Sequence, residues 1–122
     1  MKKTILLVDD SPAIRAILSL SLMKTGYEVI TAISRMNAIE KLSSSAVDIV
    51  ITDLYIHEGE GLELIRELRS SDTYKSIPII MLTAGANNSY IKSVQSAGAN
   101  AMMFKPVDHD LLNDTIISCL VN

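Results

Sequence analysis

The sequence predicts an α/β protein in which the strands of one parallel sheet alternate with helices. Short apolar runs alternate with longer segments whose apolar residues recur at helical spacing, which is the pattern of successive βα units. Most of the short runs are continuously apolar, as expected for parallel strands that helices cover on both faces. Gly26 and Gly98 each follow a helical segment, where a left-handed residue ends many helices. We therefore expect five strands and five helices in alternation.

The apolar runs place the five expected strands. Each run has the usual length of a strand, and none approaches the roughly 18 apolar residues that a membrane helix needs. We therefore expect no membrane insertion. The runs are residues 4–8, 27–31, 47–52, 78–82 and 101–104.

Apolar residues three or four positions apart place the helices between these strands. Pro12 stands where a first helical turn accepts proline, behind the capping candidates Asp10 and Ser11. The stripes of the second and fourth helices are weaker than the other three. In chain order, the stripes are Ile14, Ile17, Leu18 and Leu22; Met36, Ile39 and Leu42; Leu64, Ile65 and Leu68; Ile91 and Val94; and Leu112, Ile116, Cys119 and Leu120.

Composition excludes several classes of protein. With 122 residues, 48% hydrophobic and 20% charged, the chain has the size and composition of one packed domain. Its net charge of −3 provides no basic surface for a phosphate backbone, so direct nucleic-acid binding is not expected. Cys119 is the single cysteine, which excludes an internal disulfide and a CxxC motif and suits a reducing compartment. A cytoplasmic domain is expected.

Polar residues stand at the carboxyl ends of four expected strands, where open parallel sheets bind ligands. Asp9 and Asp10 follow the first strand, Asp53 the third, Thr83 the fourth and Lys105 the fifth. Each of these residues alone has a plain structural explanation as a cap, a turn residue or a solvated charge. Their joint placement at one edge of the sheet indicates a functional site.

The same segments resemble a known family, the receiver domains of two-component response regulators, and especially the single-domain chemotaxis type. The matching motifs are ILLVDDSPAIR, IVITDL with the downstream EGLELIRELR, IPIIMLTA and FKP, in the order of the family and with its approximate spacing. The resemblance covers the whole chain and implies a single receiver domain over residues 1–122. It also implies a flavodoxin-like, doubly wound (βα)5 fold with strand order 2-1-3-4-5, in which the first and third strands are neighbours.

The resemblance implies a magnesium site. Three carboxylates gathered within about 4–6 Å repel one another, and a divalent cation reverses the sign of that interaction. Mg²⁺ prefers hard oxygen ligands and commonly binds one or two carboxylates together with phosphate oxygens and water. Matched onto the family pattern, Asp10 and Asp53 bind Mg²⁺ directly, the Tyr55 carbonyl is a third ligand, and Asp9 acts through water.

The resemblance also implies a chemistry. Asp53 is the expected phosphoacceptor, Lys105 supplies a positive charge to a phosphoryl oxygen, and the Thr83 hydroxyl bonds another. The expected donor is a phosphohistidine on a sensor histidine kinase or on a histidine phosphotransfer protein. The bond from Lys105 to Pro106 is cis in typical members of the family. We expect no enzyme in the ordinary sense, because such domains assist only their own phosphorylation and dephosphorylation.

Three positions, Met102, His57 and Tyr55, depart from the family pattern. Met102 stands three residues before the lysine, where the family usually has the aromatic residue of its switch. His57 stands four residues after the acceptor, where proline is common. Tyr55 is bulky enough to lean over a phosphoryl group, whereas Gly85 leaves the opposite flank open. We assign no role to His57 or to His109, because lone histidines in polar segments are usually solvated.

Rival classes lack their motifs. A dinucleotide-binding enzyme requires GxGxxG after a strand, and only Gly59 and Gly61 are present; a GxxxxGK[ST] loop and the DxD of haloacid dehalogenases are absent. Two alternatives stay open: a phosphorylation-independent protein-binding module of the same fold, and an intermediate carrier in a phosphorelay.

Without an attached effector domain, we expect the signal to pass to another protein, or onward as a phosphoryl group in a relay. The family's usual surface is formed by the fourth helix, the fifth strand and the fifth helix. On this chain it is expected to include Tyr90, Ile91, Val94 and Met103. The start at Met1 favours a native chain over a fragment of a longer regulator or hybrid kinase.

Overall fold

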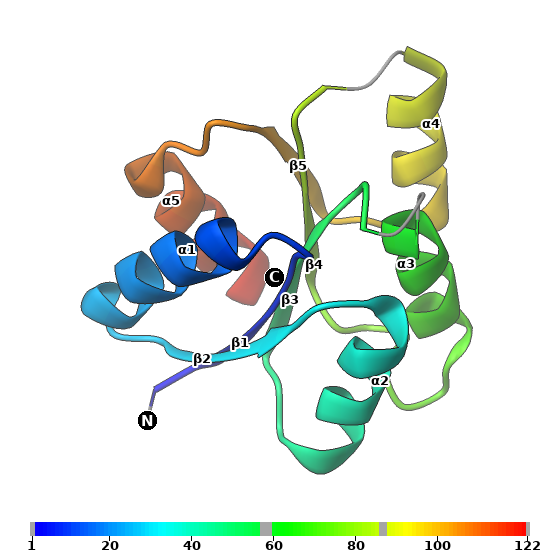
Figure 1. Cartoon of the computed structure of the whole chain (residues 1–122). Coiled ribbons are helices and arrows are strands. Elements are labelled where there is room, and N and C mark those ends of the chain that lie inside the picture. The colour runs from blue at the N-terminus through cyan, green and yellow to red at the C-terminus, as the bar shows by residue number, and fades with distance from the viewer. Residues whose placement is uncertain (1, 57–59, 86–87, 122) are drawn as a thin grey trace.

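A five-stranded parallel sheet lies between two layers of helices in the computed structural model, which describes residues 2–56, 60–85 and 88–121 (Figure 1). The strand order is β2-β1-β3-β4-β5, so the predicted flavodoxin-like fold and strand order are confirmed. The helices α1 and α5 cover one face of the sheet, and α2, α3 and α4 cover the other. No helix within the described ranges is long and apolar enough to span a membrane.

Every strand of the sheet is followed by a helix. In chain order the elements are β1 (Thr4–Val8), α1 (Pro12–Thr25), β2 (Glu28–Ala32), α2 (Arg35–Ser44), β3 (Ile49–Asp53), α3 (Glu60–Ser70), β4 (Ile79–Thr83), α4 (Asn88–Ala97), β5 (Ala101–Phe104) and α5 (His109–Leu120).

Three strands begin one or two residues later than the sequence predicts. Tyr27 lies between α1 and β2, and its amide caps the end of α1 by donating to the Leu22 carbonyl at 3.2 Å. At their carboxyl ends β3 and β4 reach one residue further than expected. Asp53 and Thr83 are therefore the last residues of paired strands, opposite Leu82 and Phe104 respectively, and do not stand in the loops after them.

Both faces of the sheet are apolar, which explains the continuous apolar runs. Along β1, Ile5 and Leu7 pack toward α1 and α5, while Leu6 and Val8 pack toward the other helix layer. All four side chains are buried. Burial of such a side chain stabilises the fold by about 1.5–3 kcal/mol, so the central strands hold the sheet rigidly beneath its polar edge.

The start and the end of α1 are capped. The Ser11 hydroxyl accepts from the Ile14 amide at 3.3 Å, so Ser11, and not Asp10, is the N-cap. Gly26 ends the helix with φ of 112°, a conformation that favours glycine, and its amide donates to the last turn. Because Ser11 is the cap, the Asp10 carboxylate is left to the functional edge of the sheet.

The predicted output surface is wrong at two of its residues, Val94 and Met103. Val94 is fully buried and Met103 is 8% exposed, because they pack into the two cores on opposite faces of the sheet. They cannot contact a partner. Tyr90 and Phe104 are the large apolar side chains of α4 and β5 that are exposed in the described structure.

The first turn of α3 lies directly against the end of β3. A Cβ at Gly61 would collide with the Asp53 carbonyl oxygen, and it would lie 2.6 Å from the Leu54 carbonyl oxygen and 2.8 Å from the Leu54 Cα. All three atoms belong to the backbone, so no side-chain rotation relieves the overlap. Gly61 thus allows the helix to pack onto the strand end that carries Asp53.

We predict that Gly61→Ala lowers the free energy of unfolding by about 1–3 kcal/mol, because the strand end or α3 has to move. Urea unfolding measures the change. Gly85→Ala is the matched control, since a Cβ there meets no atom within 4 Å in the described part of the chain. Equal stability of the Gly61→Ala protein and the wild type would show that α3 is free to shift.

Candidate functional site

The polar edge of the sheet is built by strand pairing. β1 and β3 are adjacent, with Val8 opposite Thr52, so the residues that follow lie side by side. The Asp9 amide donates to the Ala32 carbonyl at 3.1 Å, and the Lys105 amide donates to the Thr83 carbonyl at 2.7 Å, which fixes both backbones to neighbouring strands. All of these strands end at the same edge, as a parallel sheet requires.

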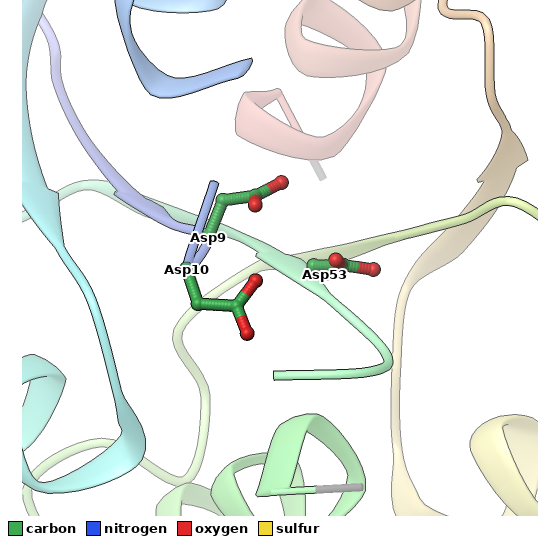
Figure 2. Close-up of side chains that lie close together, drawn as sticks. All are labelled: Asp9, Asp10 and Asp53. Atoms are coloured by element: carbon green, nitrogen blue, oxygen red, sulfur yellow. The ribbon is translucent and has the colours of Figure 1, made fainter. Parts of the chain in front are cut away.

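Three carboxylates meet at this edge. One ligand oxygen each of Asp9, Asp10 and Asp53 lies within 4.8 Å of the others. Figure 2 shows Asp9 and Asp10 leaving the end of β1 in different directions, with Asp53 on the neighbouring strand β3. Asp9 is 1% exposed and Asp53 is 9% exposed, whereas Asp10 is exposed. The predicted gathering of the three side chains is confirmed.

Lys105 is the cation of the cluster. Its Nζ lies 3.0 Å from Asp9 Oδ2 and 3.3 Å from Asp53 Oδ2. Burial alone would lower the pKa of Lys105, but the hydrogen bond to Asp9 and the charges of Asp53 and Asp9 together raise it above its ordinary value. The stabilisation from these ion pairs is therefore fully present below the ordinary pKa of lysine, and it is lost only as the pH rises through the higher folded-state pKa.

The carboxylates Asp9 and Asp10 are held differently. Asp9 Oδ1 accepts from the Ser11 amide at 2.9 Å, while its other oxygen accepts from Lys105. In the described structure the Asp10 carboxylate makes no hydrogen bond or ion pair. Asp9 is thus already satisfied by protein groups, and Asp10 is available to a ligand.

Thr83 is fully buried, and its hydroxyl is engaged in its own turn. It donates to the Gly85 carbonyl at 3.1 Å and accepts from the Gly85 amide at 3.2 Å. Strand pairing places Thr83 at the same edge as the carboxylates, but no bond joins it to them within the described residues. To bond a ligand there, the hydroxyl has to exchange its bond to Gly85.

Tyr55 contacts the site through its backbone and a neighbouring helix through its ring. Its amide donates to Asp53 Oδ1 at 3.3 Å, which orients the carboxylate. The residue is 42% exposed, and the centroid of its ring lies 5.8 Å from that of the Tyr90 ring of α4, at an interplanar angle of 59°. The contact with Tyr90 cannot be predicted from a local sequence pattern, because the two tyrosines are 35 positions apart.

The remaining expectations have mixed outcomes. The Lys105–Pro106 bond is cis, as the resemblance implies. Met102 is half-buried and packs against the core on the α2, α3 and α4 side.

Nδ1 of His109 lies 2.7 Å from the Ser21 hydroxyl, so it joins α5 to α1. Burial raises the pKa of the Cys119 thiol, which suits an unreactive residue. His57 lies outside the described residues.

The donor set suits Mg²⁺. Three hard oxygen donors converge, and one of them, on Asp10, has no protein partner among the residues that the structure describes. This matches the preference of Mg²⁺ for a few carboxylates with open positions for other ligands. A model of the response regulator receiver domain matches residues 5–117. The chain belongs to the response regulator receiver family. Members of this family are signalling modules and not enzymes with an independent substrate.

Two curated relatives show the contexts in which this domain occurs. The chain is 35% identical to chemotaxis protein CheY1 of Helicobacter pylori over 92% of each chain. It is also 35% identical to the CAI-1 autoinducer sensor kinase/phosphatase CqsS of Vibrio cholerae, where 91% of this chain matches 16% of that protein. Receiver domains of this kind thus occur both alone and within sensor proteins.

Solved structures agree with the fold. The chemotaxis protein CheY4 of Vibrio cholerae superposes with a TM-score of 0.92 at 31% identity, covering 98% of this chain and all of that one. A response regulator from Chloroflexus aurantiacus superposes with a TM-score of 0.93 at 30% identity, covering both chains completely.

We predict that Asp53→Asn raises the free energy of unfolding of the metal-free domain by about 1 kcal/mol. Asp53 faces two carboxylates within 4.8 Å and one ammonium at 3.3 Å, and two repulsions together with burial of the charge outweigh one attraction. Urea unfolding in a chelator at pH 7 measures the change. Asp72→Asn removes an exposed carboxylate outside the cluster and is the control; a loss of stability in Asp53→Asn alone would show that the Lys105 ion pair dominates.

Proposed function

We propose that residues 1–122 act as one receiver domain whose Asp53 accepts a phosphoryl group in a Mg²⁺-dependent reaction. The observation that carries the proposal is the cluster itself: three carboxylates within 4.8 Å of one another, with the Lys105 ammonium bonded to two of them. The three carboxylates and the one ammonium leave an excess of negative charge that a divalent cation would neutralise, and the cation and Lys105 together would then attract an anionic phosphoryl group.

The proposed metal ligands are carboxylates of this cluster and one backbone oxygen. Asp10 and Asp53 would hold Mg²⁺ directly, the Tyr55 carbonyl would be a third ligand, and Asp9 would act through water. Bound Mg²⁺ would neutralise charge on the phosphoryl oxygens and on the acceptor carboxylate. Asp9 is the least free of the three, since both its oxygens already accept hydrogen bonds, which supports its indirect role.

Phosphoryl transfer would use groups that the fold already aims at one place. An oxygen of Asp53 attacks phosphorus and forms an O–P bond, while the P–N bond of a donor phosphohistidine breaks and the imidazole nitrogen keeps the electron pair. The Tyr55 amide holds the acceptor carboxylate in position. Lys105, already beside Asp53, would pair with a phosphoryl oxygen, and hydrolysis of the same aspartyl phosphate would reset the domain.

Thr83 would transmit the change. Its hydroxyl donates to the Gly85 carbonyl, and donation to a phosphoryl oxygen instead would release that carbonyl and shift the segment leading to α4. Met102 lies on β5 beside the core and has three rotatable bonds, so it would repack in place of an aromatic rotation.

The proposed partners are a sensor histidine kinase or a histidine phosphotransfer protein as donor and an effector protein as receiver of the signal. The effector would contact the α4, β5 and α5 face, where Tyr90 and Phe104 are exposed. The cytoplasm is the proposed site of action, as the single cysteine suits a reducing compartment.

We predict that a small phosphodonor adds the mass of one phosphoryl group to the wild type only when Mg²⁺ is present, and that Asp53→Asn abolishes the gain. Intact mass spectrometry measures it. Asp72→Asn, which alters a carboxylate outside the cluster, should be phosphorylated like the wild type. If no donor phosphorylates the wild type, including a phosphohistidine protein, the phosphoacceptor role is wrong and a phosphorylation-independent binding module takes its place.

We predict that Tyr55→Ala speeds loss of the phosphoryl group several-fold, because the Tyr55 side chain, two residues after the acceptor, would restrict the approach of water. Tyr55→Phe keeps the ring and should match the wild type. Loss of the added mass over time, after removal of the donor, gives both rates. An unchanged rate in Tyr55→Ala would contradict shielding by this side chain, whatever the rate of phosphorylation.

A further inference from the structure

Arg15 contacts the acidic cluster without belonging to it. It lies in the first turns of α1, and its Nη1 donates to the backbone carbonyl of Asp9 at 2.8 Å. The side chain is half-buried, so the bond is partly shielded from water. That carbonyl is half of the peptide group that joins Asp9 to Asp10.

This peptide group determines where the Asp10 carboxylate points. Asp9 is held on all sides, because its amide bonds Ala32 and its two carboxylate oxygens bond the Ser11 amide and Lys105. The Asp10 carboxylate has no hydrogen bond or ion pair of its own within the described ranges. Its direction toward Asp53 therefore depends on the backbone that precedes it, and Arg15 fixes the carbonyl of that backbone.

We infer that Arg15 is a positioning residue for the metal site, which holds the Asp9–Asp10 peptide so that the Asp10 carboxylate is aimed at the cation beside Asp53. The inference rests on the proposed function. On this inference Arg15 increases the affinity for the cation, although its positive charge alone would decrease it. A positive charge near a cation site weakens cation binding, whereas a fixed ligand direction strengthens it.

The opposite signs make the inference testable. Mg²⁺ affinity is measured by calorimetry on the wild type, Arg15→Gln and Arg15→Lys, with Lys24→Gln at the far end of α1 as the control for loss of one positive charge. Arg15→Gln should weaken Mg²⁺ binding about tenfold, the usual size for loss of a group that orients a metal ligand. Arg15→Lys should bind with intermediate affinity, and Lys24→Gln should match the wild type.

A double-mutant cycle separates positioning from general stability. If Arg15 acts through Asp10, Arg15→Gln should change Mg²⁺ affinity much less in an Asp10→Asn background than in the wild type. An equal change in both backgrounds would overturn the inference, as would Mg²⁺ binding by Arg15→Gln that is unchanged or tighter. Melting in a chelator checks that each variant is folded, and Arg15→Lys takes the place of Arg15→Gln in the cycle if the glutamine variant does not fold.

Failure of the proposed function gives a different result. A folded wild type that binds no Mg²⁺ would overturn the proposed metal site and the role of Arg15 together. A wild type that binds Mg²⁺ and is phosphorylated, with Arg15→Gln equal to it in affinity, would overturn the role of Arg15 alone.

Discussion

Mutual repulsion of three carboxylates at one edge of the sheet is the constraint on which the rest of this structure depends. The pairing of β1 with β3 places Asp9 and Asp10 beside Asp53, and neither strand can move without breaking the continuous apolar cores on both faces. A unit-charge repulsion at such distances costs on the order of 1–4 kcal/mol at intermediate dielectric. This is a large part of the 5–15 kcal/mol by which a domain is usually stable, so the charge has to be compensated locally.

The compensation is unequal among the three carboxylates. Lys105 bonds Asp9 and Asp53, the Ser11 amide bonds Asp9, and the Tyr55 amide bonds Asp53. Asp10 alone receives none of these bonds within the described structure, and it is also the exposed member of the three. The cluster therefore keeps one carboxylate open to a ligand, while Lys105 offsets part of the charge of the buried pair. This asymmetry suits a site that binds a cation reversibly.

Most of the fold and of the charged site could be predicted from the sequence, because both depend on repeated local patterns. Continuous apolar runs mark buried parallel strands, and polar residues directly after them have to meet at one edge. What could not be predicted depends on distant contacts that no local pattern records. Arg69 illustrates this, since its guanidinium bonds the carbonyls of Gly98, Lys75 and Ile77 and the side chain of Asn100. In the sequence it is an ordinary charge near a helix end.

The same difference explains the wrong expectation for the output face. Their positions in α4 and β5 predict Val94 and Met103 on the surface, but which side of an element is buried depends on its rotation against the sheet. The roles of Gly61 and Tyr90 also depend on distant contacts. A Cβ at Gly61 would overlap the end of β3, and the Tyr90 ring contacts the ring of Tyr55.

These contacts connect the acceptor strand to its surroundings at two points. Gly61 lets α3 pack against the backbone of Asp53 and Leu54, and the Tyr55 ring meets Tyr90 at the start of α4. Asp53 is therefore connected to α3 and to α4 by contacts of its own backbone and of nearby residues. Position 102 carries a methionine that packs against the core, whereas the Tyr55–Tyr90 contact joins the segment after the acceptor to α4. The residues that form the charges of the site thus follow the family pattern, whereas Met102 and Tyr55 depart from it.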